Sequence, residues 1–221
     1  MFYDLCLRPD NIEKAIEFAR KLGWEGIGLL FNDLRQAEEA KKNIQKNIDV
    51  TPGIMIKTDK TGEMQKMVKQ NRMKSELIVV EGVSEEINRA ALETEEVDIL
   101  IMDPKAETGF NHIMARLAQK NNVAVCFSFQ DLLHSNKKMR ADVFHRYLEI
   151  AKLCRKFRSP FVVSSCAQSE WDLRSPSDLL SFGRLLGFSD PQIKNAMSDG
   201  IVRENRKRLS GKWAMPGVEL G

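Results

Sequence analysis

Short apolar runs alternate with amphipathic segments along most of the chain. Several runs, such as ELIVVE and VDILIM, are apolar at nearly every position. Strands that are covered on both faces have this composition, so the pattern predicts a parallel sheet. The predicted strands cover residues 2–7, 24–30, 50–57, 76–81, 97–102, 123–128 and 161–164.

The segments between these runs carry helix-start signals. Asp10 precedes an apolar stripe of helical period that ends at Gly23, and Glu13 has the spacing of a capping-box partner for Asp10. The same spacing recurs at Ser175–Asp178 and at Ser189–Gln192, which predicts two further helix starts late in the chain.

The order of elements is β-α repeated seven times, with a long helix over about 139–157, followed by two or three further helices. Crossover helices of this kind cover the faces of a parallel sheet. Seven strands favour a single TIM-like (β/α) barrel over a short open sheet, and no eighth strand is evident after residue 164. The glycines of GWEGIGLL lie before and inside a strand, which excludes a phosphate-cradling turn there. We expect one barrel domain over 1–208 and a basic tail over 209–221.

Composition narrows the class of protein. The 221 residues are 43% apolar, enough for a sizeable core, and contain no apolar run of 18 or more. The first residues lack a signal-peptide pattern, so we expect a cytoplasmic protein. The four cysteines, at positions 6, 126, 154 and 166, have no C-x-x-C spacing and mostly apolar neighbours. We expect them to be reduced and buried, in preference to metal or redox use.

Charge is distributed unevenly along the chain. Residues 1–136 carry 18 Lys and Arg against 22 Asp and Glu, a net −4, whereas residues 137–221 carry 16 against 9, a net +7. A basic C-terminal third suggests a polyanionic partner, although a solvated surface explains the charge equally well.

In a barrel, ligands meet the loops that follow the carboxyl ends of the strands. A catalytic metal site there needs several imidazoles and carboxylates together. The three histidines, His112, His134 and His145, all fall outside the predicted strands, and Asp4 and Asp103 alone make a poor zinc site. We therefore expect no metal in this chain.

The stretch VVSSCA raises the question of a nucleophile, because Ser164, Ser165 and Cys166 follow a strand directly. A nucleophile needs a base within reach, and the G-x-S-x-G elbow is missing. Small polar residues after a strand are ordinary turn chemistry, so we expect no catalytic residue here. A weaker alternative is a small-molecule enzyme that uses Asp103 and Lys105, together with the first strand's aspartate, as acid and base.

The mouth loops offer hydrogen-bond donors instead. Any one long cation is more often simply solvated, but as a group these residues favour contact with a phosphate backbone. Exposed aromatic side chains are scarce among them, so base stacking is not expected to be the main mode. The donors in or just after these loops are Lys57, Lys105, Asn111, His112, Arg116 and Arg174.

Three segments carry a family resemblance: FYDLCLRPD, GFNHIMARLAQKNNVAVCFSF and RSPFVVSSCAQSEWDLRSPSDLLSFGRLLG. In this order they resemble archaeal ribonuclease P protein component 3, the counterpart of the thirty-kilodalton subunit of the eukaryotic enzyme. The likeness covers about residues 1–208. It implies a barrel related to the polymerase-and-histidinol-phosphatase metal hydrolases. Those enzymes open with H-x-H on the first strand, where this chain has Tyr3-Asp4-Leu5, so the resemblance implies a kept fold and a lost metal site.

The resemblance further implies a non-catalytic subunit that assists a catalytic RNA in removing the 5′ leader from precursor tRNA. The catalytic magnesium would lie on the RNA, and this chain would hold no cofactor. The implied partners are the ribonuclease P RNA and another small protein subunit, with precursor tRNA contacted indirectly. The alternative function is an independent metal-dependent phosphoesterase on the same barrel.

Two further cations lie outside the mouth loops. Arg89, in the helix after the fourth strand, and Lys194, in the helix opened by Ser189, could equally form surface ion pairs of little energetic consequence. His112 could donate to a phosphate or cap the turn, and the two readings are evenly balanced. The predicted RNA-contacting residues are Arg89, Lys105, His112, Arg116, Arg174 and Lys194.

Overall fold

A computed structural model describes the backbone of residues 1–43, 48–104, 109–210, 213–215 and 218–219. Side chains are described for 1–37, 39, 48–104 and 109–210. Within these ranges, none of the helices combines the length and the apolar character needed to span a membrane.

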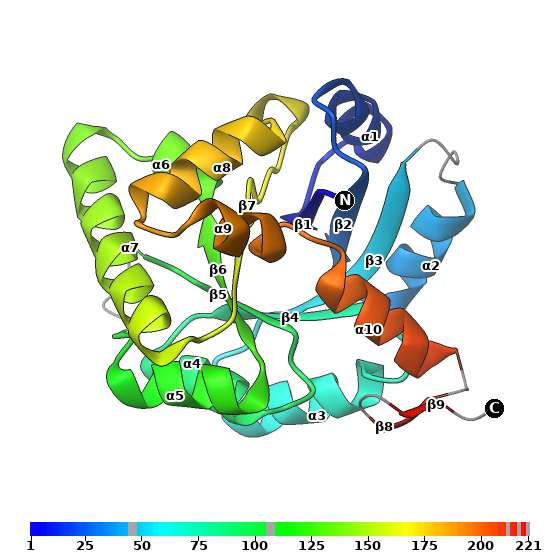
Figure 1. Cartoon of the computed structure of the whole chain (residues 1–221). Helices are drawn as coiled ribbons and strands as arrows, with labels where there is room; N and C mark the ends of the chain where they lie inside the picture. Colours follow the sequence, from blue (N-terminus) through cyan, green and yellow to red (C-terminus); the bar gives the residue numbers. More distant parts are fainter. Residues whose placement is uncertain (44–47, 105–108, 211–212, 216–217, 220–221) are drawn as a thin grey trace.

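Seven parallel strands form one sheet, and each strand pairs with the next in sequence order (Figure 1). The sheet curls so that its first and last strands lie side by side, which makes a nearly closed (β/α)7 barrel. The TIM-like barrel predicted from the seven apolar runs is confirmed. The strands are β1 (Tyr3–Leu7), β2 (Gly26–Phe31), β3 (Asp49–Ile56), β4 (Leu77–Gly82), β5 (Ile99–Met102), β6 (Ala124–Ser128) and β7 (Phe161–Ser164).

Helices surround the barrel, and three of them follow the last strand, as predicted (Figure 1). A short 3₁₀ turn, Glu170–Asp172, follows β7, and an antiparallel pair, β8 (Trp213–Met215) and β9 (Val218–Glu219), lies near the C-terminus. The helices are α1 (Ile12–Lys21), α2 (Leu34–Asn43), α3 (Thr61–Asn71), α4 (Glu85–Glu93), α5 (His112–Asn121), α6 (Phe129–Leu133), α7 (Lys137–Phe157), α8 (Pro176–Leu185), α9 (Asp190–Ala196) and α10 (Gly200–Leu209).

Two of the three predicted helix starts are confirmed. Capping boxes are present at Ser175–Asp178 and at Ser189–Gln192. The start predicted at Asp10 is wrong by one residue, because the side chain of Asn11 accepts the hydrogen bond from the backbone N–H of Lys14. Asp and Asn are about equally good N-caps, so the local sequence does not distinguish the two positions.

The barrel has two apolar layers. Side chains such as Leu5, Met55, Val79 and Ile99 fill its interior, and a larger cluster lies between the strands and the helices. Gly28 lets the first two strands approach closely, since a Cβ there would lie 2.3 Å from the carbonyl oxygen of Leu5. The glycines of the second strand therefore serve packing, as their position in the sequence suggested.

Helix α10 lies across the amino-terminal end of the barrel (Figure 1). The Arg206 guanidinium donates to Asp49 and to Glu76, at 2.6 Å in each case, and the Tyr3 hydroxyl donates to Asp49 at 2.5 Å. The buried side chain of Arg208 donates to Asn205 at 2.8 Å. Part of the basic charge of the C-terminal third is thus neutralised inside the fold.

The seam between β1 and β7 is closed by side chains. No backbone ladder joins these two strands in the described structure, although the N–H of Arg8 donates to the carbonyl of Ala167 just beyond them. Asp4, fully buried in β1, instead accepts hydrogen bonds from the hydroxyls of Ser164 and Ser165 and from the Ser165 N–H at 3.1 Å. These hydrogen bonds join β1 to β7, the two strands between which a complete (β/α)8 barrel would have its eighth strand.

The seam is sensitive to protonation of Asp4. Burial raises the pKa of this carboxyl from 3.8 to about 7, and the hydrogen bonds from Ser164 and Ser165 offset only part of the effect. Because the folded-state pKa is raised, the protonated form favours folding. The stabilisation is complete below about pH 4 and is lost as the pH rises through about 7.

We expect the Asp4→Asn variant to lack this pH dependence. An amide stays neutral, and the serine hydroxyls can rotate to bond it. The free energy of unfolding of the parent should fall relative to that of the variant between pH 4 and 7, by on the order of 4 kcal/mol at most. Urea unfolding at a series of pH values measures the difference, and parallel curves for the two proteins would contradict the assignment.

Candidate nucleic-acid interface

The carboxyl ends of the strands form the mouth of the barrel, where a barrel enzyme has its active site. Glu81, at the end of β4, pairs there with two cations: Lys57 at 2.7 Å and Arg8 at 3.3 Å. The positive charge of Lys57 is therefore partly neutralised by Glu81, which makes this lysine a weaker candidate for contact with a polyanion.

The histidines do not converge. His112 is exposed at the start of α5, and His145 lies on α7, 3.5 Å from the Glu149 carboxylate. His134 follows α6, and its Nε2 lies 2.8 Å from a carboxylate oxygen of Asp172. These positions, on α5, on α7 and in the turn after α6, do not form a cluster of imidazoles.

The VVSSCA stretch has a structural role at this edge. Its first residues complete β7, as predicted, and Ser164, Ser165 and Cys166 are all buried. Both serine hydroxyls donate to Asp4, and both side chains are fully buried, so neither is exposed to a substrate that it could attack. The same bonds hold Asp4 in the buried seam, whereas Asp103 is exposed. The two aspartates therefore do not act together as the acid and base of a small-molecule enzyme.

Arg174 is the predicted contact residue that the structure holds most firmly. Its Nη1 donates to the carbonyls of Trp171 at 2.9 Å and Leu173 at 2.8 Å, and its guanidinium lies 5.4 Å from the centre of the Phe129 ring. Its own carbonyl accepts a hydrogen bond from the Trp24 indole at 2.8 Å. The side chain is half-buried and therefore has its position fixed before any ligand arrives.

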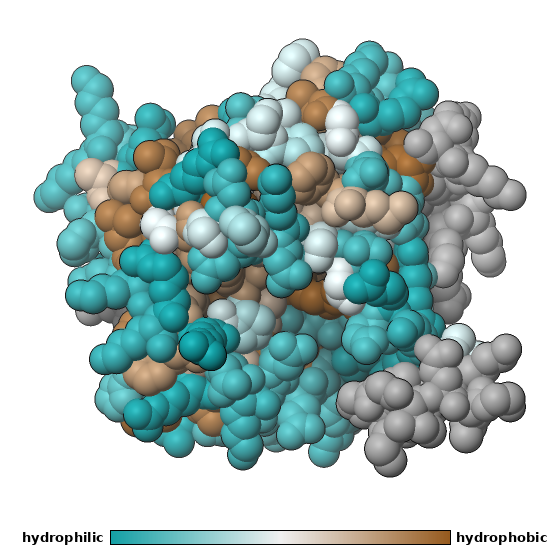
Figure 2. Space-filling model, viewed as in Figure 1, coloured by the Kyte–Doolittle hydropathy of each residue, from teal (hydrophilic) through white to brown (hydrophobic). Residues whose placement is uncertain are grey.

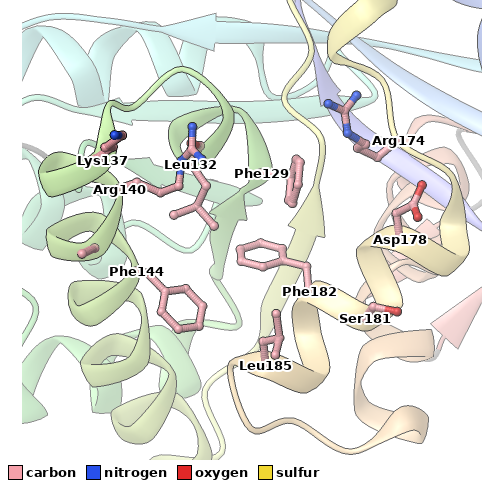
Figure 3. Close-up of a pocket in the computed structure, with 11 residues that line it drawn as sticks. Phe129, Leu132, Lys137, Arg140, Phe144, Arg174, Asp178, Ser181, Phe182 and Leu185 are labelled. Carbon is pink, nitrogen blue, oxygen red and sulfur yellow. The ribbon is translucent and has the colours of Figure 1, made fainter.

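A groove of about 810 Å³ runs between α7 and α8, starting at Arg174 (Figure 3). Lys137, Arg140 and Arg174 lie toward one end, and aromatic and aliphatic side chains, together with those of Asp178 and Ser181, line the rest. Figure 2 shows the same mixture of hydrophobic and hydrophilic surface over these two helices. The sequence prediction missed Lys137 and Arg140, although the polar segment HSNKKMR that contains them was evident.

His112 and Arg116 lie one turn apart on α5, and both are exposed. The Asn111 carboxamide caps this helix, accepting from the N–H groups of Ile113 at 3.0 Å and of Met114 at 3.1 Å. The cap is therefore Asn111 and not His112, and phosphate donation by His112 stays a prediction. The Arg116 guanidinium stacks on the Phe157 ring, 5.3 Å from its centre.

The other predicted residues are less distinctive. Arg89 on α4 is exposed and pairs with Glu93 one turn away, with 2.9 Å between Nε and Oε1. Lys194 on α9 lies toward the opposite end of the barrel, since the carbonyl of Met197 accepts from the N–H of Tyr3 at the start of β1. Lys105 falls outside the described residues.

Four of the six predicted residues lie at two separate places rather than on one rim. Arg89, His112 and Arg116 lie on neighbouring helices α4 and α5, and Arg174 lies across α7 from them, beside α8 (Figure 1). The long helix α7 separates the groups, and Lys137 and Arg140 at its start extend the Arg174 group.

Comparison with known proteins gives a consistent result. The family model for RNase P subunit p30 matches residues 1–210. Ribonuclease P protein component 3 of Methanothermobacter thermautotrophicus is 32% identical over 209 residues, which are 89% of this chain and 85% of the relative. The protein of the same name from Methanococcus maripaludis strain S2/LL is 33% identical over 218 residues, covering 94% and 93%.

The fold also matches a solved assembly. A chain in the cryo-EM structure of archaeal ribonuclease P with mature tRNA superimposes with a TM-score of 0.84 at 28% identity, covering 98% of this chain and 96% of that one. The match extends over the whole barrel and its surrounding helices. On the family model and these relatives, the chain belongs to the RNase P subunit p30 family.

Proposed function

We propose that this chain is a protein subunit of archaeal-type ribonuclease P that assists the catalytic RNA in 5′-leader removal and does not cleave RNA by itself. One observation carries the proposal: the fold matches, over nearly the full length of both chains, a chain of an archaeal ribonuclease P assembly that contains tRNA. The ribonuclease P RNA and another small protein subunit are its partners.

The arrangement of side chains supports a non-catalytic role. A phosphoesterase on this barrel would gather imidazoles and carboxylates at the mouth. Here the described mouth residues Asp4, Ser164 and Ser165 are buried and bonded to one another. Of the histidines, His112 and His145 lie on two different helices, and His134, in the turn after α6, is bonded to Asp172. The magnesium that cleaves the phosphodiester is supplied on the RNA.

Fixed cations support the RNA contact. Arg174, with Lys137 and Arg140 nearby, offers guanidinium and ammonium donors beside an apolar groove. His112 and Arg116 offer a second, exposed pair on α5, and Arg89 and Lys194 are the weaker members of the predicted set. Lys105 belongs to the set as a residue of a mouth loop in the sequence. Donors of this type neutralise phosphates without reading base sequence.

Reconstitution tests the proposal directly. Catalytic RNA and its other protein subunits should cleave precursor tRNA faster, or at lower magnesium concentration, when this chain is added. The chain alone should leave both precursor tRNA and a generic phosphodiester intact in the presence of Mg²⁺, Mn²⁺ or Zn²⁺. Turnover by the isolated chain would support the phosphoesterase alternative instead.

The Arg174→Ala variant should lower RNA affinity of the reconstituted complex by roughly tenfold, the size expected for one charge-assisted contact. Thermal unfolding should stay cooperative. Arg174→Met, which keeps the contact with Phe129 and removes the charge, should show the same loss of affinity. Arg184→Ala is the control, since Arg184 on α8 pairs with Asp190 at 2.7 Å and should not contribute. Unchanged affinity in both Arg174 variants would exclude this residue from the interface.

Binding of the catalytic RNA should weaken steeply as salt rises, because each phosphate contact releases counterions. Each contact contributes about 0.7 to 0.9 to the slope of log affinity against log salt concentration. A filter-binding titration at several KCl concentrations gives the slope, and Arg174→Ala should flatten it by about one contact. Affinity that is constant over a several-fold change in salt would refute the phosphate-contact account.

A further inference from the structure

Three of the four cysteines meet inside the barrel. Cys6 on β1, Cys126 on β6 and Cys166 just after β7 are almost fully buried. The Cys126 sulfur lies 3.9 Å from that of Cys6 and 3.7 Å from that of Cys166, and all three sulfurs lie within 4.8 Å of one another. Among the described side chains, they are the one group of three or more potential metal ligands at this spacing.

The backbone departs from regular geometry at two of the three cysteines. Between Asp4 and Leu7, β1 advances three residues while β2 advances two, from Ile27 to Leu29. This extra residue is a bulge, and it lets both Leu5 and Cys6 join the interior cluster. Cys166 has φ of 51°, in the left-handed region that a β-carbon disfavours. The bulge thus lies at Cys6 and the left-handed residue is Cys166, and the sulfur atoms of these two residues lie within 4.8 Å of each other.

The sulfur spacing matches that around a bound metal. At a metal–sulfur bond length of about 2.3 Å, three sulfurs around one ion lie about 4 Å apart. The observed 3.7 and 3.9 Å between sulfurs fall at this separation, whereas a disulfide would require about 2.05 Å. The thiols could therefore bind an ion with only small side-chain movements.

We propose that Cys6, Cys126 and Cys166 form a buried three-sulfur site for a soft thiophilic metal ion. Thiolate ligands select Cu⁺ and Zn²⁺ among biological metals. Three ligands without an evident fourth suit Cu⁺ better, since Zn²⁺ in structural sites takes four. The ion joins β6, β7 and β1 across the place where the backbone ladder is missing, so its role is to hold the barrel closed. This site differs from a hydrolase metal centre in ligand type and in burial.

Cd²⁺ is a suitable probe because its bonds to thiolates absorb in the ultraviolet. The full chain, refolded under reducing conditions with a chelator and then with Cd²⁺, should bind one ion. The intensity of the sulfur-to-metal absorption should correspond to three thiolates per ion. The midpoint of thermal unfolding should rise with Cd²⁺ concentration, since the ion binds only the folded chain. Competition with Cu⁺ and with Zn²⁺ then identifies the preferred ion.

Cys154→Ser provides the matched control. Cys154 is equally buried but lies on α7 in the outer apolar layer, so this variant should keep the absorption and the thermal shift. Cys126→Ser should lose both. If its folding fails without metal, as judged by circular dichroism, Cys126→Ala replaces it. Even if both Cys126 variants fail to fold, the parent and Cys154→Ser still test the proposal. Absence of the sulfur-to-metal absorption in these two proteins would overturn it. A disulfide between two of the three cysteines in the purified protein would also overturn it.

Discussion

The closure of the barrel depends on one buried side chain, that of Asp4. Seven strands leave a gap where an eighth would stand in a complete (β/α)8 barrel, and Asp4 crosses that gap to Ser164 and Ser165. Burying a carboxylate is costly unless it is neutral or fully bonded, and here hydrogen bonding and a raised pKa together reduce that cost. The first and last strands are 160 residues apart in sequence, so this contact fixes the closure of the whole sheet.

Tyr3 and Leu5 occupy the positions where the resemblance to metal hydrolases would place an H-x-H pair. In this chain both side chains pack inside the barrel. The Tyr3 hydroxyl reaches Asp49 at the amino-terminal end, where Arg206 completes the network. Residues at the strand ends thus stabilise the closed barrel.

Net charge says little about where a polyanion binds. The C-terminal third is strongly basic, but Arg206 and Arg208 are held within the fold beneath the barrel. Arg174 differs because its guanidinium is both fixed and accessible, at the end of a groove with Lys137 and Arg140. A cation held in position loses less conformational entropy on binding a phosphate than a free lysine does.

The sequence by itself determined the seven β-α units, two of the helix caps and the family resemblance. These features depend on local periodicity and on residues three or four apart, which a single chain displays directly. The sequence missed the short strands β8 and β9, which lie after residue 164 and outside the barrel sheet. The tertiary structure alone decided that Asn111 rather than His112 caps α5, that four of the predicted residues lie at two separate places, and that Lys194 lies away from the mouth. It also brought together Asp4 with two serines, and three cysteines separated by 120 and 40 residues. Such long-range contacts depend on how the sheet closes, and no local spacing in the sequence encodes them.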